Sequence, residues 1–225
     1  MNKEARPFKV PAKAAARLAK NSSIFRHITP VELKKGELRK LQIIEGTIRC
    51  LAQKGWLNTN YETVGQLCGM KRPHVAYHYP KWDDLIFSTL NFVWATGQTV
   101  VGDHLRETTR PAEQLKAYVE GTFHWLTAYP DHHAAILLMW HLATFNKRYR
   151  DLSTELKRLG TERVHAIVFN SEPVKKTSVN WKTALTLHAQ LVGRCVEFMS
   201  SDLTVSAEAL VSQTVEEMLR GGRLK

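Results

Sequence analysis

The chain has 225 residues, which is the length of one large domain or of two small domains that share a core. Hydrophobic residues make up 44% and charged residues 24% of the chain, values typical of a globular protein with a sizeable core. The formal net charge of +11 favours an acidic partner, nucleic acid first and an anionic membrane surface second. The longest apolar run, 134–140, has seven residues, whereas a membrane-spanning helix needs about 18.

The positive charge is concentrated at the N-terminus, where residues 1–40 carry a net charge of +8. This segment is typical of a phosphate-seeking arm, although a solvated tail or a short basic helix over 12–20 would have the same composition. It has no apolar segment of the kind found in secretory signals, and the cysteines Cys50, Cys68 and Cys195 lack metal-binding spacing. We therefore expect a cytoplasmic protein without a cofactor or metal.

The first clear helix begins at Thr29 and Pro30, which fit an N-cap and a first helical residue, and continues to Lys54. Its apolar residues recur on one face, and Gly55 is predicted to close it in the left-handed conformation. These apolar residues are Leu41, Ile44, Ile48 and Leu51.

Two short helices follow. Thr59 and Glu62 predict a capping box for the first, with Asn60 as an alternative cap, and Gly69 predicts the turn that ends it. The second begins near Arg72 and Pro73 and ends before Pro80.

The remainder of the chain is also predicted to be helical, and no run of alternating residues indicates a strand, so the expected fold class is all-α. The predicted helices are 83–106, 111–127, 130–145, 147–169, 181–200 and 207–219, the last ended by Gly221 and Gly222.

A longer helix followed by two short helices that meet across a glycine turn is the arrangement of a helix-turn-helix unit. The second short helix would present its N-terminal half to base edges in the major groove of DNA. The stretch resembles the DNA-binding domain of the TetR family of repressors, without a gap from Val64 to Leu85. The residues that carry the resemblance are Ile43-Ile44, Gly55-Trp56, Val64-Gly65, Cys68-Gly69-Met70, His78-Tyr79 and Asp83-Asp84-Leu85.

Three positions depart from the family pattern. Ala76 stands where the family has a phosphate-contacting Tyr, and Tyr77 follows one place later. Lys81-Trp82 replaces the family's Ser-Lys, which displaces the phosphate-binding Lys by one residue, and Lys71 replaces a Ser cap. These departures leave the individual phosphate contacts open.

The resemblance implies a basic arm over 1–28, a three-helix DNA-binding domain over 29–85 and a helical effector-binding and dimerisation domain over 86–225. It implies a non-enzymatic, dimeric repressor that a small-molecule effector releases from its DNA operator. The expected DNA contacts are Asn60, Tyr61, Lys71, Arg72, Pro73, His74, Tyr77, His78, Tyr79 and Lys81. The expected effector contacts are Trp94, Phe123, His124, Met139, Trp140 and His141, although aromatic residues at helical spacing also occur as plain core.

Two apolar stripes in the last two helices are expected to pair with a second copy as a four-helix bundle, unless they belong to the core of a single chain. They comprise Leu185, His188, Ala189, Val192, Cys195, Val196 and Met199, and then Val205, Leu210, Val211, Val215, Met218 and Leu219.

Two other functions compete with the DNA-binding one. Glu120, His124 and His132 carry groups that a small helical enzyme or a zinc protein would use. The N-terminal arm could alternatively dock on an anionic membrane.

Overall fold

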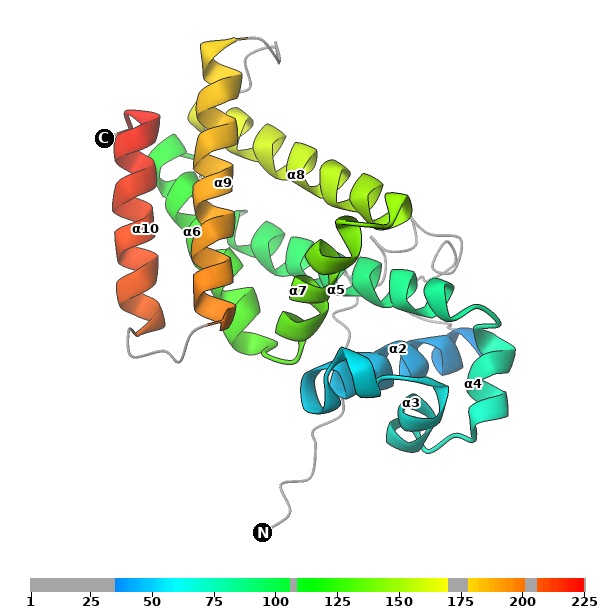
Figure 1. Cartoon of the computed structure of the whole chain (residues 1–225). Helices are drawn as coiled ribbons and strands as arrows, with labels where there is room; N and C mark the ends of the chain where they lie inside the picture. The colour runs from blue at the N-terminus through cyan, green and yellow to red at the C-terminus, as the bar shows by residue number, and fades with distance from the viewer. Residues whose placement is uncertain (1–34, 106–108, 170–177, 201–205, 225) are drawn as a thin grey trace. The chain divides into compact units, whose positions relative to one another are not determined.

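A computed structural model describes residues 35–105, 109–169, 178–200 and 206–224, and every regular element in these ranges is a helix (Figure 1). The all-α fold predicted from the sequence is confirmed. The predicted start of the first helix at Thr29 lies outside the described residues. The elements are α2 (Lys35–Lys54), the 3-10 turn η1 (Trp56–Asn58), α3 (Tyr61–Cys68), α4 (Arg72–His78), α5 (Trp82–Leu105), α6 (Pro111–Ala128), α7 (His132–Ala143), α8 (Lys147–Val168), α9 (Val179–Ser200) and α10 (Ala207–Gly222).

The chain divides into two compact units. The first contains the chain up to Thr99 together with Ala134–Ile136, and the second contains Val100–His133 and the chain from Leu137 onward. Helix α5 is continuous and contributes residues to both units. In the described ranges, no helix combines the length and the apolar character that crossing a membrane requires.

The first unit is built on the apolar face of α2. Ile44, Ile48 and Leu51 are buried as the periodicity predicts, and α3 packs against both α2 and α4. Gly46 allows the close approach of α3, because a Cβ atom at this position would overlap the Sγ atom of Cys68. The cost of glycine inside a helix, about 1 kcal/mol relative to alanine, is therefore offset by packing between helices.

One cap in this unit differs from the prediction, and at a second the predicted alternative is confirmed. Gly55 has a positive φ of 72°, but its ψ of 172° is extended rather than left-handed helical, since it leads into η1. The cap of α3 is Asn60, whose side chain accepts the backbone N–H groups of Glu62 and Thr63. Thr59 instead closes η1, and its hydroxyl donates to the carbonyl of Gly55.

The second unit packs α8 against α9, and α10 against α6 and α9 (Figure 1). The residues that α9 buries differ from the predicted stripe. Most of them precede a predicted residue by one position, and Cys195 is the one residue that belongs to both sets. The buried residues are Ala184, Leu187, Leu191, Cys195 and Phe198. The other residues of the predicted α9 stripe are partly or fully exposed in the single chain.

Helices α8 and α9 approach closely where Gly160 faces His188. A Cβ atom at position 160 would overlap the His188 ring, so glycine makes room for the imidazole. Burial, followed by the charges of Lys157 and Arg163, lowers the pKa of His188 to about 4. The ring is therefore neutral at physiological pH and acts as a packing group.

Polar side chains also connect α9 to α10. Glu217 accepts hydrogen bonds from Arg194 at 2.8 Å and from Gln190 at 2.6 Å, and the guanidinium of Arg194 lowers the pKa of the Glu217 carboxyl. The predicted end of α10 was wrong, because the helix continues through Gly221 and Gly222. A side chain at Gly221 would crowd Leu187, so this glycine serves helix packing, and Arg223 forms the left-handed cap with φ 54°.

Candidate nucleic-acid interface

Helix α4 presents most of its side chains to solvent. Val75 is its buried residue, and it anchors the helix in the first unit. Pro73 lies in the first turn, where a missing N–H group costs no hydrogen bond. Four exposed residues lie at the N-terminal end of α4 and one in its last turn. They are Lys71, Arg72, Pro73 and His74, and then Tyr77.

The turn between α3 and α4 depends on two glycines. Gly69 adopts the left-handed conformation with φ 66° and ψ 32°, and its N–H group closes the end of α3. A Cβ atom at Gly65 would lie 2.6 Å from the carbonyl oxygen of Met70, so α3 tolerates no side chain there. Arg49 of α2 donates to the carbonyl of Leu67 at 2.9 Å, which fixes the end of α3 on the helix behind it.

Tyr61 holds the C-terminal end of α4. Its hydroxyl donates to the backbone carbonyl of Tyr79 at 2.7 Å, and its ring meets that of Trp82 edge-on at 5.0 Å. A phenol has one proton to donate, and a phosphate oxygen only accepts. Tyr61 therefore has no proton left for a DNA phosphate in this arrangement, contrary to the role expected from the sequence.

Tyr79 requires a second correction. Its side chain is 3% exposed, and burial raises the pKa of its hydroxyl, so it belongs to the core rather than to a binding surface. Asn60 is exposed, but its amide oxygen is used to cap α3. Lys81 is exposed and directly precedes α5.

His78 is partly buried at the end of α4 and lies edge-on to the Tyr77 ring at 5.3 Å. Burial lowers the pKa of His78, and the charges of Lys40, Arg39 and His74 lower it further. The sequence does not distinguish Arg39 and Lys40 from the rest of the basic N-terminal segment. Their proximity to α4 comes from the packing of α2 against α4.

The expected effector contacts come from both units. Trp94 belongs to the first unit and the other five belong to the second. Phe123 and Met139 are core residues, 2% and 1% exposed, and Phe123 packs edge-on against Phe198 at 5.5 Å. Trp140 is partly buried.

Both histidines of the expected effector set are exposed. His124 lies 3.2 Å from His104 between ring nitrogens. His141 meets the Phe145 ring edge-on at 5.4 Å.

The structure does not favour the metalloprotein or enzyme alternative. Glu120 forms a surface ion pair with Lys116 at 3.7 Å. His132 is 1% exposed, accepts the Trp125 indole N–H at 3.2 Å, and has its pKa lowered to about 3, mainly by burial. Among the described residues, no three His, Cys, Asp or Glu side chains are grouped to hold a metal ion.

The sequence matches no family model and no curated protein. Solved structures are similar, and many of them are TetR-family transcriptional regulators. A TetR-like regulator from Rhodococcus sp. RHA1 has a TM-score of 0.68 and 12% identity, over 86% of this chain and 100% of that one. A TetR regulator from Haloarcula marismortui has a TM-score of 0.69 and 18% identity, over 82% and 96% of the two chains.

A third similar structure is a putative transcriptional regulator from Saccharomonospora viridis in complex with choline. It has a TM-score of 0.67 and 17% identity, over 81% of this chain and 96% of that one. At these identities, the similarity establishes that the chain has the fold of TetR-family regulators.

Proposed function

We propose that this protein, which has the fold of TetR-family regulators, is a dimeric transcriptional repressor that a small-molecule effector releases from operator DNA. The observation that carries the proposal is the exposed surface of α4, where Lys71, Arg72, His74 and Tyr77 all face solvent. Arginine and lysine side chains donate to the acceptors of guanine in the major groove, and the exposed N-terminal half of a recognition helix is the part that reaches base edges.

Binding to duplex DNA tests this function. Duplexes are selected by the full chain from a random library, and their affinity is compared with that of scrambled duplexes by fluorescence anisotropy across a salt series. We expect a clear preference for the selected sequence and an affinity that falls steeply as the salt concentration rises.

Two kinds of variant separate base contacts from phosphate contacts. Arg72→Ala and His74→Ala should each reduce discrimination by about 1–3 kcal/mol, because they remove groups that face base edges. Lys81→Ala should weaken both duplexes alike and reduce the salt slope by about 0.9 for each lysine lost. A wild-type chain that binds selected and scrambled duplexes equally would refute the proposed function.

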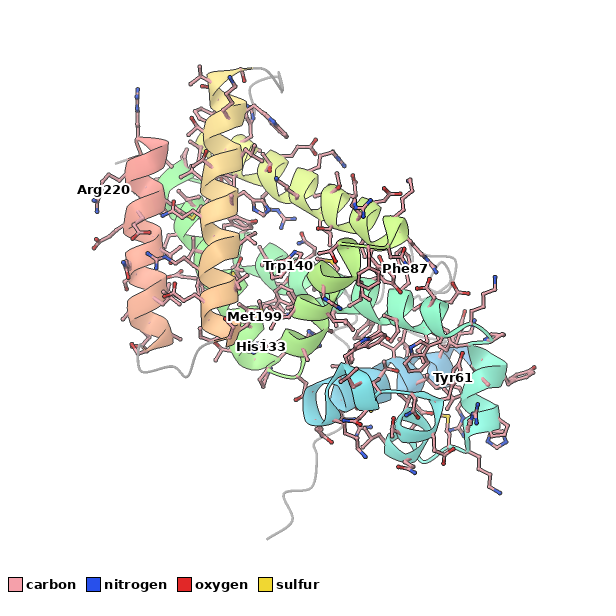
Figure 2. The ribbon with its side chains drawn as sticks, viewed as in Figure 1. Tyr61, Phe87, His133, Trp140, Met199 and Arg220 are labelled. Atoms are coloured by element: carbon pink, nitrogen blue, oxygen red, sulfur yellow. The ribbon has the colours of Figure 1, made fainter. Side chains whose placement is uncertain are left out.

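A partly exposed apolar stripe on α9 supports the dimer. Its members recur with alternating spacings of four and three residues, the pattern of helices that pair along their length. Met199 marks its C-terminal end (Figure 2). The stripe consists of Leu185, Ala189, Val192, Val196 and Met199. A two-fold dimer through α9 and α10 would present two copies of α4 to half-sites about 34–36 Å apart.

We place the effector site in the second unit, where α6 and α7 carry Phe123, Met139 and Trp140. An effector that binds the DNA-incompetent form more tightly shifts the population away from the operator. A true effector should raise the melting temperature of the protein and lower the affinity of the protein for DNA. Because this coupling is reciprocal, operator DNA should lower the affinity of the protein for the effector. Choline, which a similar regulator binds, is a suitable first compound for the screen.

A further inference from the structure

A second basic group lies beside α4, and two of its three members, Arg39 and Lys40, are outside the residues expected to contact DNA. Arg39 and Lys40 come from the N-terminal half of α2, and His78 comes from the last turn of α4. The ammonium of Lys40 lies 5.8 Å from the centre of the Tyr79 ring, and the guanidinium of Arg39 donates to the Gln42 side chain at 3.0 Å. Packing of α2 against α4 thus brings basic side chains from both helices to one place.

The electrostatics of this cluster disfavour a third positive charge. The charged groups that act on the His78 ring are Lys40 and Arg39 from α2 and His74 from α4 itself, and all of them are cations or bases. Together with burial they hold the pKa of His78 below its usual value, so its imidazole is neutral near pH 7. An anion placed among these groups would be attracted to the two permanent cations and would favour a proton on the imidazole.

The phosphates of the DNA backbone are anions of this kind. Where the family pattern has its phosphate-binding lysine, this chain has Trp82, whose ring packs against Tyr61 and offers no cation. Lys81, one residue earlier, is exposed, and Arg39 and Lys40 add two further cations beside α4. Phosphate contacts of this kind position a protein on the duplex without reading its sequence.

We propose that Arg39, Lys40 and His78 form a phosphate-binding subsite of the DNA interface, in which His78 takes up a proton from solvent when the DNA backbone binds. The subsite rests on the proposed function, since it needs α4 to face DNA. It makes two predictions that a purely structural role for these residues does not. DNA affinity should rise as the pH falls, and the salt dependence should decrease when Arg39 or Lys40 loses its charge.

The test uses the full chain and a fluorescent duplex of about 30 base pairs, long enough for two half-sites, in its selected and scrambled forms. Affinity is measured between about pH 6 and 8, around the ordinary pKa of histidine, and across a salt series. The variants are Arg39→Gln, Lys40→Gln and His78→Gln. Lys54→Gln is the matched control, because Lys54 is an exposed lysine at the other end of the same helix.

For the wild type, uptake of one proton per chain increases the affinity by up to about tenfold per pH unit for each chain bound. We expect His78→Gln to flatten this dependence, whereas His74→Gln should keep it with a midpoint at higher pH. Lys40→Gln should move the midpoint of the pH dependence to higher pH, because a cation next to His78 has been removed. This measurement tests the subsite with His78 itself intact. Arg39→Gln and Lys40→Gln should each reduce the salt slope by about 0.9 per chain, whereas Lys54→Gln should leave it unchanged.

The subsite is refuted if the pH dependence survives in His78→Gln, or if the salt slopes of Arg39→Gln and Lys40→Gln match that of Lys54→Gln. The scrambled duplex separates this failure from failure of the proposed function. Selective but pH-independent binding would overturn the subsite alone. Equal, pH-dependent binding to both duplexes would overturn the repressor function and retain the subsite. Circular dichroism of each variant confirms that a lost response does not reflect unfolding.

Discussion

At the scale of single residues, the hydroxyl of Tyr61 shows how one hydrogen bond decides a role. From its place at the start of α3, Tyr61 is a reasonable DNA contact. In the structure its only proton is donated to the carbonyl of Tyr79 at 2.7 Å, at the end of α4. The same phenol thus holds the end of α4 in place.

Tyr61→Phe should therefore lower the free energy of unfolding by about 0.5–1.5 kcal/mol, the usual net value of an internal hydrogen bond. Urea denaturation followed by circular dichroism measures this change. Tyr77→Phe is the matched control, because Tyr77 is 81% exposed, and it should leave the stability unchanged. A Tyr61→Phe variant that keeps full stability and loses DNA affinity would return Tyr61 to the list of phosphate contacts.

The sequence predicts which residues can cap or turn the chain, but not which of two neighbours does so. Thr59 and Asn60 are both good caps, and in the structure Asn60 caps α3 whereas Thr59 closes η1. The sequence is equally ambiguous about Tyr79. Its aromatic ring suits a DNA surface as well as a core, and only the packing of the first unit shows that it is buried.

At the scale of helices, Gly160 sets the distance between α8 and α9. Position 160 faces the ring of His188, which occupies the volume that a side chain there would need. In an exposed helix, replacing glycine with alanine stabilises by about 1 kcal/mol. Here the overlap should outweigh that gain, because overpacking a core costs about 1–3 kcal/mol.

We expect Gly160→Ala to lower the melting temperature, and Gly193→Ala, which has open space around its Cβ position, to preserve or raise it. His188→Ala removes the overlapping ring, so the double variant should be more stable than the sum of the two single changes implies. A double-mutant cycle from thermal or urea unfolding measures this coupling. Strictly additive effects would show that the two side chains do not interact.

Helix bounds were largely predictable, whereas helix faces and ends were less so. Periodicity and proline positions gave the core face of α2 and the starts of α4 and α6, because those signals are local. The end of α10 was not predictable, since Gly221 and Gly222 look like a stop until their contacts with α9 and α8 are known. The apolar residues of α9 cover more than one face, and the sequence merged a buried face with an exposed stripe.

At the scale of the whole molecule, the fold predicted from the resemblance is confirmed, while the assembly remains a proposal. The stripe on α9 supplies the reason for a dimer, because apolar side chains at paired-helix spacing remain accessible in the single chain. The partner of such a stripe is not determined by one chain's sequence, which is why its role needs a separate measurement.

Val192→Glu and Val196→Glu should convert the protein to a monomer, because a charge at the centre of an apolar interface is costly to bury. Light scattering coupled to size-exclusion chromatography measures the mass. Ala166→Glu, on an exposed position of α8, is the control and should remain dimeric. If both α9 variants keep the mass of the wild type, the dimer must form through a different surface or be absent.

The burial of the native thiols has a practical consequence for labelling. Cys50 is completely buried, and the pKa values of Cys68 and Cys195 are raised to about 11 and about 12, so little reactive thiolate is present at neutral pH. A cysteine introduced at the exposed position of Tyr77 should react first with a spin label. In a dimer, the distance between two such labels would report the separation of the two α4 helices in solution, with and without a candidate effector.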